Sequence, residues 1–369
     1  AGNAATAGVM VGMGFLGGCF MPIQLLPGAF QSVARVLPTG WAVGAFGTIV
    51  KITGGTGSVQ AEPTGQHFED VDVIDATHAW AVGSSGAIIR TVNGTDWTSV
   101  TSPTSEYLTT VQFLNANEGW VAGYGNALYY TPDAGVTWRF KGTADVDFHI
   151  HDIRVDADTV WAVGRNSAYE VRVYKATDGK IHTNLPADAP LYAGIPVPGL
   201  NGYPTSMCYL DSTHLWLTSA AGDVVFNNGT GWSSQTVPYE AGWLNGIDFR
   251  SATTGVFVGS GGAVGRTSTG GTAWTSRTSY TDNPVFAIDF LSLATGYAVS
   301  AEDIIKTTDG GQTWARIDTA QDRGLLNVDF LDATHGAAVG QTGTILLNTG
   351  GAAWTPVTGP SLSIEFRGV

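Results

Sequence analysis

One five-residue phrase recurs eight times along the chain, at a spacing close to forty residues. The copies are GWAVG, AWAVG, GWVAG, VWAVG, LWLTS, GVFVG, GYAVS and GAAVG, beginning at Gly40, Ala79, Gly119, Val160, Leu215, Gly255, Gly296 and Gly336. The differences between successive start positions are 39, 40, 41, 55, 40, 41 and 40 residues, so only the fourth interval is stretched. Self-similarity at a fixed period is typical of repeat architectures, in which each repeat is one structural unit.

Each unit contains the pattern of several short strands. After the phrase comes a Gly-bearing turn and then an apolar alternation, such as residues 48–52 or 344–347. Upstream lies a second alternating segment, seen as Val71-Asp72-Val73, Val111-Gln112-Phe113, Ile247-Asp248-Phe249, Ile288-Asp289-Phe290 and Val328-Asp329-Phe330. Alternation with a period of two residues between turns indicates antiparallel strands, and three to four strands in forty residues are typical of a β-propeller blade. We therefore predict an all-β, eight-bladed β-propeller, or a seven-bladed one if one unit is degenerate.

The two ends of the propeller are predicted to share one blade. Ile364-Glu365-Phe366 fits the V-D-F segment better than Val33-Ala34-Arg35 does, so a C-terminal strand at 362–367 is expected to complete the first blade. Such closure removes the exposed sheet edges that an open array would leave. The predicted domains are an N-terminal hydrophobic membrane segment at 1–30 and a propeller at 31–369.

Composition excludes several classes of function. The 31 acidic and 17 basic residues give a formal net charge of −14, which lacks the positive footprint that a nucleic-acid partner requires. The two cysteines, Cys19 and Cys208, lie far apart in dissimilar contexts, which argues against a disulfide framework or a cysteine-based zinc site. No phosphate-binding loop or dinucleotide fingerprint is present, so no cofactor is predicted.

The N-terminal segment is apolar and long enough to span a bilayer. Residues 7–26 carry no charge, and the glycines fall into two small-xxx-small pairs that allow close helix packing, Gly8 with Gly12 and Gly14 with Gly18. We predict a transmembrane helix whose glycines contact a partner helix. A buried apolar extension and a signal or lipoprotein segment are the alternatives, since Leu16-Gly17-Gly18-Cys19 has the form of a lipobox. The stretch at 17–43 also resembles the last membrane segments of ABC-2 type permeases.

The repeats carry a recognisable turn motif. Residues 307–314 (TTDGGQTW) and 131–138 (TPDAGVTW) match the Asp-box pattern, with Asp133, Gly135 and Trp138 in one copy and Asp309, Gly311 and Trp314 in the other. An Asp box is structural: the Asp accepts backbone hydrogen bonds in a hairpin turn, Gly takes a positive φ and Trp packs between blades. Together with the phrases, these boxes make residues 40–369 resemble the Ycf48-like family of BNR-type propellers, the photosystem II stability and assembly factors and their relatives.

The sequence offers little catalytic machinery. Sialidases also contain Asp boxes, but their arginine trio has no counterpart among the twelve scattered arginines, so a glycoside hydrolase is a third and disfavoured hypothesis. The recurring acids Asp72, Asp248, Asp289, Asp329 and Glu365 occupy one repeat position, where a structural hydrogen bond or an acidic channel is expected. Asp147, His149 and His151 share one face of a strand and are weak metal-binding candidates, although a third strong ligand is lacking. Cys208 stands at the acid position and is expected to be buried.

The stretched interval contains a Pro/Gly-rich insertion at 185–205. Its apolar and aromatic residues, among them Tyr192 and Tyr203, are the predicted partner contacts, and folding back over the rim is the alternative. The leading functional hypothesis is a non-enzymatic, membrane-anchored accessory subunit that stabilises or assembles a membrane protein complex. Resemblance to the Ycf48-like family implies a photosynthetic reaction centre as the partner, with the propeller on the periplasmic, extracytoplasmic or lumenal side. A secreted or surface propeller that binds glycan or protein is the alternative.

Overall fold

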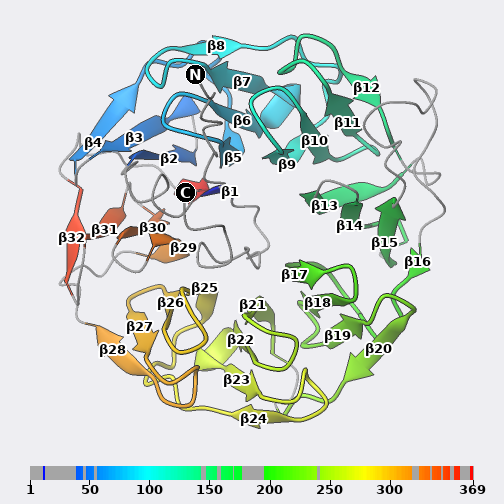
Figure 1. The fold of residues 1–369 in the computed structure, drawn as a ribbon, viewed down its shortest axis with the longest axis vertical. Coiled ribbons are helices and arrows are strands. Elements are labelled where there is room, and N and C mark those ends of the chain that lie inside the picture. Colours follow the sequence, from blue (N-terminus) through cyan, green and yellow to red (C-terminus); the bar gives the residue numbers. More distant parts are fainter. Residues whose placement is uncertain are drawn as a thin grey trace, which may run out of the picture.

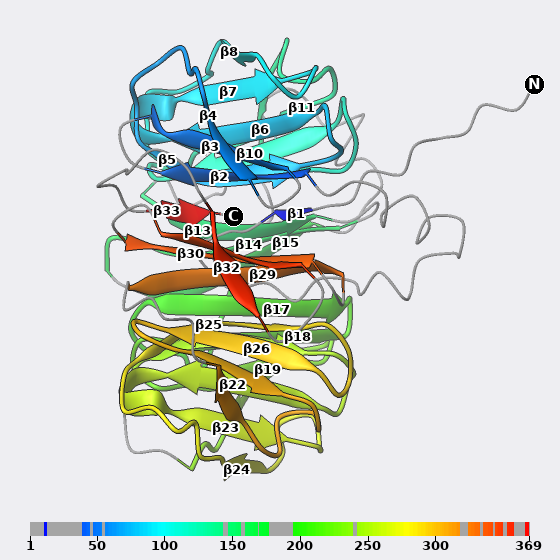
Figure 2. The same ribbon diagram turned by 90° about the vertical axis from the view of Figure 1, so that its left-hand side faces the viewer.

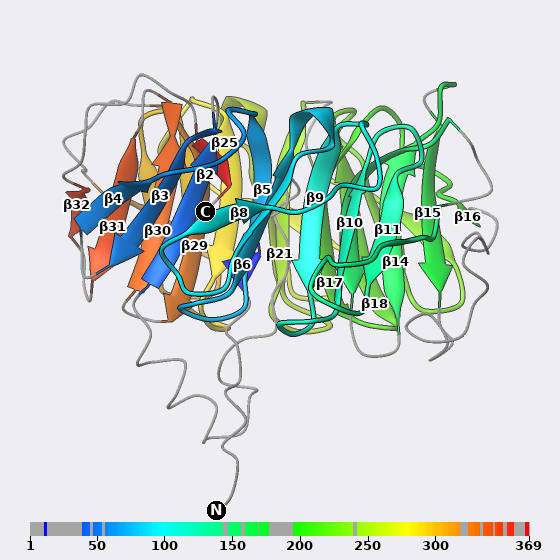
Figure 3. The same cartoon turned by 90° about the horizontal axis from the view of Figure 1, so that it is seen from above.

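The chain forms eight antiparallel sheets arranged as blades around a central axis (Figure 1). The computed structural model describes residues 11–12, 39–44, 47–53, 56–142, 147–155, 159–168, 170–176, 195–238, 242–317, 324–332, 335–341, 344–349, 353–357 and 366–368. The prediction of an eight-bladed, all-β propeller is therefore confirmed. Seen from the side, the strands of successive blades run across the thickness of a disc (Figures 2 and 3).

Each blade has four strands ordered from the axis outward, and blade 2 carries a fifth. Blade 1 contains β33 (Phe366–Gly368), β2 (Thr39–Gly44), β3 (Ile49–Thr53) and β4 (Thr56–Gln60). Blade 2 contains β1 (Val11–Gly12), β5 (Phe68–Val73), β6 (Ala79–Gly83), β7 (Ile88–Thr91) and β8 (Trp97–Ser99), with the turn η3 (Ser84–Gly86). Blade 3 contains β9 (Leu108–Phe113), β10 (Gly119–Gly123), β11 (Leu128–Thr131) and β12 (Arg139–Phe140). Blade 4 contains β13 (His149–Val155), β14 (Val160–Arg165), β15 (Val171–Ala176) and β16 (Ile195–Pro196).

The second half of the ring repeats this order. Blade 5 contains β17 (Pro204–Asp211), β18 (His214–Ser219), β19 (Val224–Asn227) and β20 (Trp232–Gln235). Blade 6 contains β21 (Leu244–Phe249), β22 (Gly255–Gly259), β23 (Val264–Thr267) and β24 (Trp274–Ser276), with the turn η4 (Ser260–Gly262). Blade 7 contains β25 (Val285–Phe290), β26 (Gly296–Ser300), β27 (Ile304–Thr307) and β28 (Ala315–Ile317). Blade 8 contains β29 (Leu325–Asp332), β30 (His335–Gly340), β31 (Ile345–Thr349) and β32 (Trp354–Pro356).

The hydrophobic core lies between neighbouring blades. In three blades the aromatic residue of the phrase stacks on a phenylalanine near the end of the innermost strand of the next blade. Ring centroids are 3.8 Å apart for Trp80 and Phe113, 3.7 Å for Trp216 and Phe249, and 4.3 Å for Tyr297 and Phe330. The phrase therefore recurs because each copy supplies one half of an inter-blade contact, and burial of these large rings stabilises the ring of blades.

The C-terminal strand β33 pairs with β2 of blade 1, in a register that differs from the predicted one. Phe366 lies opposite Gly44 and Gly368 opposite Val43, whereas in blade 6 these places belong to Leu244 and Gly246. Ile364-Glu365-Phe366 is therefore not in register with the V-D-F segments. In the observed register, Gly368 occupies the place that Gly246 has in blade 6. A side chain would be crowded there, because a Cβ on Gly246 would lie 3.1 Å from Val258.

Most of the N-terminal segment and part of the insertion lie outside the described residues. These include Gly8, Gly14, Gly18, Cys19 and Tyr192. Gly12 belongs to β1, whose residues Val11 and Gly12 pair with Val73 and Asp72 of β5. Within the part of the chain that the structure describes, no helix is both long and apolar enough to cross a membrane. The transmembrane segment stays a prediction.

Candidate functional site

The two complete Asp boxes form closed hydrogen-bonded turns. In blade 7, Asp309 accepts hydrogen bonds from the Thr313 backbone at 2.9 Å and from the Thr313 hydroxyl at 2.6 Å. Gly311, with φ 80°, donates to Thr307 at 2.9 Å. These hydrogen bonds to the carboxylate lower the pKa of Asp309 to about 2 despite some desolvation. The carboxylate is fully committed to the turn, which makes the box a structural element.

The other box has the same geometry, and both box tryptophans pack against the preceding blade. Asp133 accepts from Thr137 at 2.7 and 2.6 Å, and Gly135 donates to Thr131 at 2.7 Å. Trp314 packs with Val256 and Val258 of blade 6, and Trp138 packs with the core that contains Trp80 of blade 2.

The side chains at the recurring acid position connect neighbouring blades at five junctions. The side chain at this position accepts a backbone hydrogen bond from the residue that ends the next innermost strand. The pairs are Phe113 to Asp72 at 2.5 Å, Phe290 to Asp248 at 2.8 Å, Phe330 to Asp289 at 3.0 Å, Val155 to Gln112 at 2.8 Å and Phe249 to the Cys208 sulfur at 3.2 Å. Asp329 is buried at the equivalent place in blade 8, and Glu365 lies outside the described residues. In the described part of the chain, these side chains therefore link neighbouring blades through hydrogen bonds.

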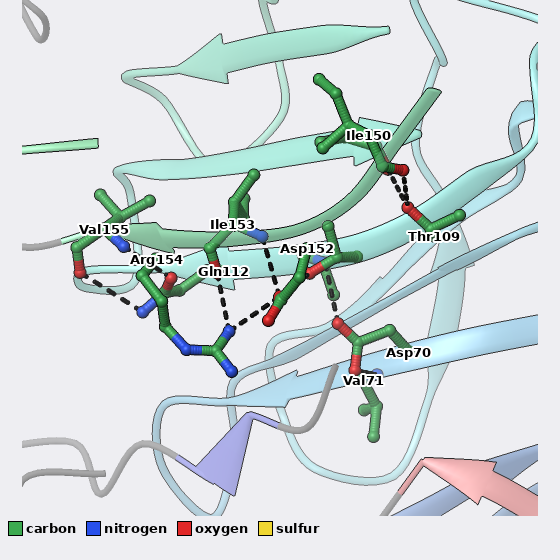
Figure 4. Close-up of polar contacts among 12 residues, drawn as sticks. Asp70, Val71, Thr109, Gln112, Ile150, Asp152, Ile153, Arg154 and Val155 are labelled. Atoms are coloured by element: carbon green, nitrogen blue, oxygen red, sulfur yellow. Dashed lines mark hydrogen bonds and ion pairs between the residues drawn. The ribbon is translucent and has the colours of Figure 1, made fainter. Parts of the chain in front are cut away.

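Burial leaves several of these carboxyls with raised pKa values. Desolvation raises the pKa of Asp72 to about 7 and that of Asp152 to about 6, although Arg154 lowers both. Arg154 lies 2.8 Å from Asp152, beside Asp70, which accepts a hydrogen bond from the Val111 backbone at 2.9 Å (Figure 4). The axial acids therefore form a structural network whose charge depends on pH.

A cluster of rings lies on the face of the disc at which the innermost strands begin, here called face A. One repeat position just before or at the start of these strands carries an aromatic or imidazole ring in five successive blades: His67, Tyr107, His149, Tyr203 and Trp243. These five residues are equivalent because the backbone carbonyl of each makes the same contact. It lies beside the last residue of the phrase in its own blade, or it accepts a hydrogen bond from the backbone N–H of the residue after the phrase. Of these, Tyr203 is 44% exposed and Trp243 is 63% exposed. The opposite face of the disc is called face B.

The middle of this series is linked by direct contacts. The ring of Tyr124, which is 37% exposed, lies 5.5 Å from Tyr107, 4.8 Å from His149 and 6.3 Å from His151. Arg165 is paired across the strands with His149 and places its guanidinium 4.2 Å from the ring of Tyr203. We call Tyr107, Tyr124, His149, His151 and Tyr203, together with Arg165, the ring cluster. It spans blades 3 to 5.

The ring cluster contains a neutral imidazole but no group of metal ligands among the residues that the structure describes. Burial, Arg165 and His149 together lower the pKa of His151 to about 4, so this imidazole is neutral at pH 7. Asp147 accepts a hydrogen bond from Ser167 at 2.8 Å. Among the residues described, no three His, Cys, Asp or Glu side chains form a group that could hold a metal ion. Asp147, His149 and His151 therefore do not constitute such a group, and the two histidines belong to an aromatic surface.

The structure brings some predicted residues together and adds others. His149 and His151, considered as metal candidates, lie in the same cluster as Tyr203, considered as a partner contact. Tyr107, Tyr124 and Arg165 were not predicted. Aligning the repeats by the position before the innermost strand would have found Tyr107 beside His149 and Tyr203, whereas Tyr124 lies in a separate turn and joins them only in three dimensions.

Comparison with known proteins identifies relatives of this propeller. A family model described as "Photosynthesis system II assembly factor YCF48" matches residues 57–139 and 224–322. These segments contain the strands β5 to β11 and β19 to β28, with most of β4 and the first residue of β12. No curated protein matches the chain significantly in sequence.

Solved structures share the fold at low sequence identity. "YCF48 bound to D1 peptide" is 19% identical with a TM-score of 0.52, covering 69% of this chain and 82% of that chain. "YCF48 from Cyanidioschyzon merolae" is 16% identical with a TM-score of 0.53, covering 74% and 91%. A catalytically inactive virginiamycin B lyase from Staphylococcus aureus is 15% identical with a TM-score of 0.55, covering 71% and 87%. The propeller architecture is thus shared by assembly factors and by at least one enzyme family.

Proposed function

Because the chain belongs to the Ycf48-like family of β-propellers, we propose that it is a non-enzymatic accessory subunit that assembles or stabilises a membrane protein complex, with a photosynthetic reaction centre as the partner. The observation that carries the proposal is the family match. In addition, the recurrent acids accept hydrogen bonds between blades and so have a structural role. One solved relative is described as bound to a D1 peptide, which supports a membrane-protein segment as the ligand.

The ring cluster on face A is the surface we assign to this contact. Aromatic and arginine side chains are enriched in the centres of protein interfaces, since they bury large area with little loss of side-chain entropy. Tyr124 and Tyr203 are the exposed members and stand on either side of the strand that carries His149 and His151. Tyr203 lies near the C-terminal end of the insertion at 185–205, so this described part of the segment lies on the same surface.

Co-purification tests the contact. The tagged full chain, purified from detergent-solubilised membranes of the cells that produce it, is expected to retain reaction-centre polypeptides identified by mass spectrometry. Tyr124→Ala with Tyr203→Ala is expected to weaken retention by about tenfold or more, because truncated interface hot spots cost about 2 kcal/mol each. Leu293→Ala and Val136→Ala are matched controls, since these side chains are 60% and 70% exposed on face B. Equal loss in the controls, or none in the double variant, contradicts the assignment.

Membrane anchoring by residues 7–26 is a separate part of the proposal, and it requires Val11 and Gly12 to leave their pairing with β5. Its support is the uncharged length of this segment and its paired glycines. A protein that resists salt extraction and is released by detergent is the expected result, with the propeller protected inside closed vesicles of cytoplasmic-side-out orientation. Gly14→Leu is expected to release the chain from its complex without changing the melting temperature of the propeller. Extraction of the wild type by salt alone contradicts the anchor.

A further inference from the structure

Two linkers between blades are near copies of one another. Residues 97–107 (WTSVTSPTSEY) and 274–284 (WTSRTSYTDNP) align without a gap. Equivalent serine side chains make the same hydrogen bond in both: the Ser102 hydroxyl donates to the Thr104 carbonyl at 2.9 Å, and the Ser279 hydroxyl donates to the Thr281 carbonyl at 3.0 Å. The first linker is therefore an internal reference for the second.

The second linker departs from the first at residues that line one hollow. Arg277 stands in place of Val100, Tyr280 in place of Pro103 and Asp282 in place of Ser105. All three departures line a hollow of about 400 Å³ on face A. Its remaining lining is Gly261, Gly262, Ser276, Thr278, Ser279 and Thr281. Two further differences, Asn283 and Pro284, lie outside it.

Arg277 places a guanidinium group where the sister linker has an apolar side chain. Its counterpart Val100 packs against the core of blades 2 and 3. The Nη1 of Arg277 donates to the Ser276 carbonyl at 3.3 Å, whereas its Nε is buried and has no hydrogen-bond partner in the described part of the chain. No described carboxylate forms an ion pair with this guanidinium. A buried polar group without a partner is destabilising, so the blade tolerates a penalty that its sister does not carry.

Tyr280 adds a second penalty at the same hollow. Its φ is 61°, in the left-handed region that is strained for a bulky residue, and its side chain is 67% exposed. Strained residues persist where the surroundings require them and cluster at ligand sites. The strain therefore places a large aromatic side chain at the edge of a polar hollow.

We propose that this hollow binds a hexose unit of a glycan or of a glycolipid headgroup. Arg277 supplies donors, Asp282 supplies acceptors, and the hydroxyls of Ser276 and Thr278 can do both, which matches the mixed donors and acceptors of a sugar ring. The Ser279 hydroxyl is used within the linker. The opposite charges of Arg277 and Asp282 favour a neutral polar ligand over an anion or a metal cation. The Tyr280 ring supplies an apolar surface for the C–H face of the sugar. The volume is that of a small-ligand site.

Binding to the full chain tests the proposal with two probes. Methyl β-galactoside and methyl β-glucoside are titrated by saturation-transfer NMR, and phosphatidylcholine vesicles with and without digalactosyldiacylglycerol are used in co-sedimentation. Saturable binding of a glycoside assigns a soluble glycan as the source. Binding that requires the galactolipid assigns a headgroup. Absence of binding to both probes overturns the proposal.

The sister linker provides the variants and controls. Arg277→Val installs the residue that the sister linker tolerates, and is expected to weaken binding about tenfold or more through loss of its charged hydrogen bonds. Tyr280→Gly is expected to weaken binding while raising the melting temperature, since glycine relieves the positive φ. Asp282→Ser tests the exposed acceptor without disturbing the core, and Pro103→Gly in the sister linker is the control. Wild-type affinity in Arg277→Val, Tyr280→Gly and Asp282→Ser overturns the proposal. The face A contact at Tyr124 is unaffected by these changes, so the proposed function stands or fails separately.

Discussion

Gly255 lies directly opposite Phe249 in blade 6, and a Cβ added to this glycine would lie 2.5 Å from the phenyl ring. The same pair recurs as Gly119 with Phe113, Gly296 with Phe290 and Gly336 with Phe330. Where valine replaces phenylalanine on the innermost strand, the phrase begins with a residue larger than glycine: Ala79 lies opposite Val73, and Val160 lies opposite Val155. The glycine of the phrase is therefore required by the ring that covers it.

This pairing predicts a compensating pair of substitutions. Gly255→Ala is expected to destabilise the propeller by about 1–3 kcal/mol, because the added methyl group overpacks the site. Phe249→Val is expected to destabilise it by leaving a cavity beside Trp216, and the double variant is expected to lose less than the sum of the two, as in the Val73 and Ala79 pair of blade 2. Denaturant unfolding measures the cycle. Additive losses would show that the ring and the glycine are not coupled.

The axial acids predict an unusual pH dependence of stability. The pKa of Asp72 is raised to about 7 in the folded chain, so the folded state keeps a proton that the unfolded state releases near pH 4. The free energy of unfolding should therefore be greatest below about pH 4 for this group and fall as pH rises to about 7, by an amount on the order of 2–4 kcal/mol. Asp152 and Asp289, with pKa values of about 6, act in the same direction.

Asp72→Asn isolates that contribution, because the amide oxygen still accepts the hydrogen bond from Phe113 but does not ionise. Melting temperatures between pH 4 and 7 are expected to fall less steeply in the variant than in the wild type. Superimposable profiles would show that Asp72 is not the titrating group.

The Asp box of blade 7 predicts an opposite dependence at lower pH. Because the folded pKa of Asp309 is lowered to about 2, its stabilising hydrogen bonds are present above about pH 4 and are lost as pH falls toward 2. Asp309→Ala is expected to cost about 1–2 kcal/mol near neutral pH, as loss of a capping acceptor does. Asp309→Asn keeps one acceptor, as Asn93 does in blade 2 with Thr95 at 2.9 Å, and should cost less. Equal losses in the two variants would contradict this account of the turn.

The sequence predicts the blades well because each repeat contains its own contacts. The phrase glycine, its covering ring and the acid that joins the next blade all recur at fixed positions, so eight copies indicate eight blades. The register of β33 was not predictable from Ile364-Glu365-Phe366. These three residues resemble the V-D-F segment, but no glycine of a following phrase pairs with their phenylalanine, and elsewhere in the ring that pairing fixes the register. The ring cluster was only partly visible, since Tyr124 and His149 meet through turns of different blades. The hollow at Arg277 depends on departures from the repeat, and these become informative only when the two linkers are aligned by the serine hydrogen bonds that they share.

Closure of the ring gives the last prediction. β33 pairs with β2 through Val43 and Gly44, and it supplies the innermost strand of blade 1 among the described residues. Deleting residues 361–369 exposes the inner edge of β2, and an exposed edge promotes pairing with other chains. The truncated chain is expected to melt at a lower temperature, to unfold less cooperatively and to aggregate, as measured by calorimetry and light scattering. Deleting only Val369, which lies beyond β33, is the control. Propeller blades stabilise one another around the ring, so loss of a strand from blade 1 should lower the melting temperature of the whole propeller. A truncated chain that melts like the wild type would therefore show that blade 1 does not depend on its C-terminal strand.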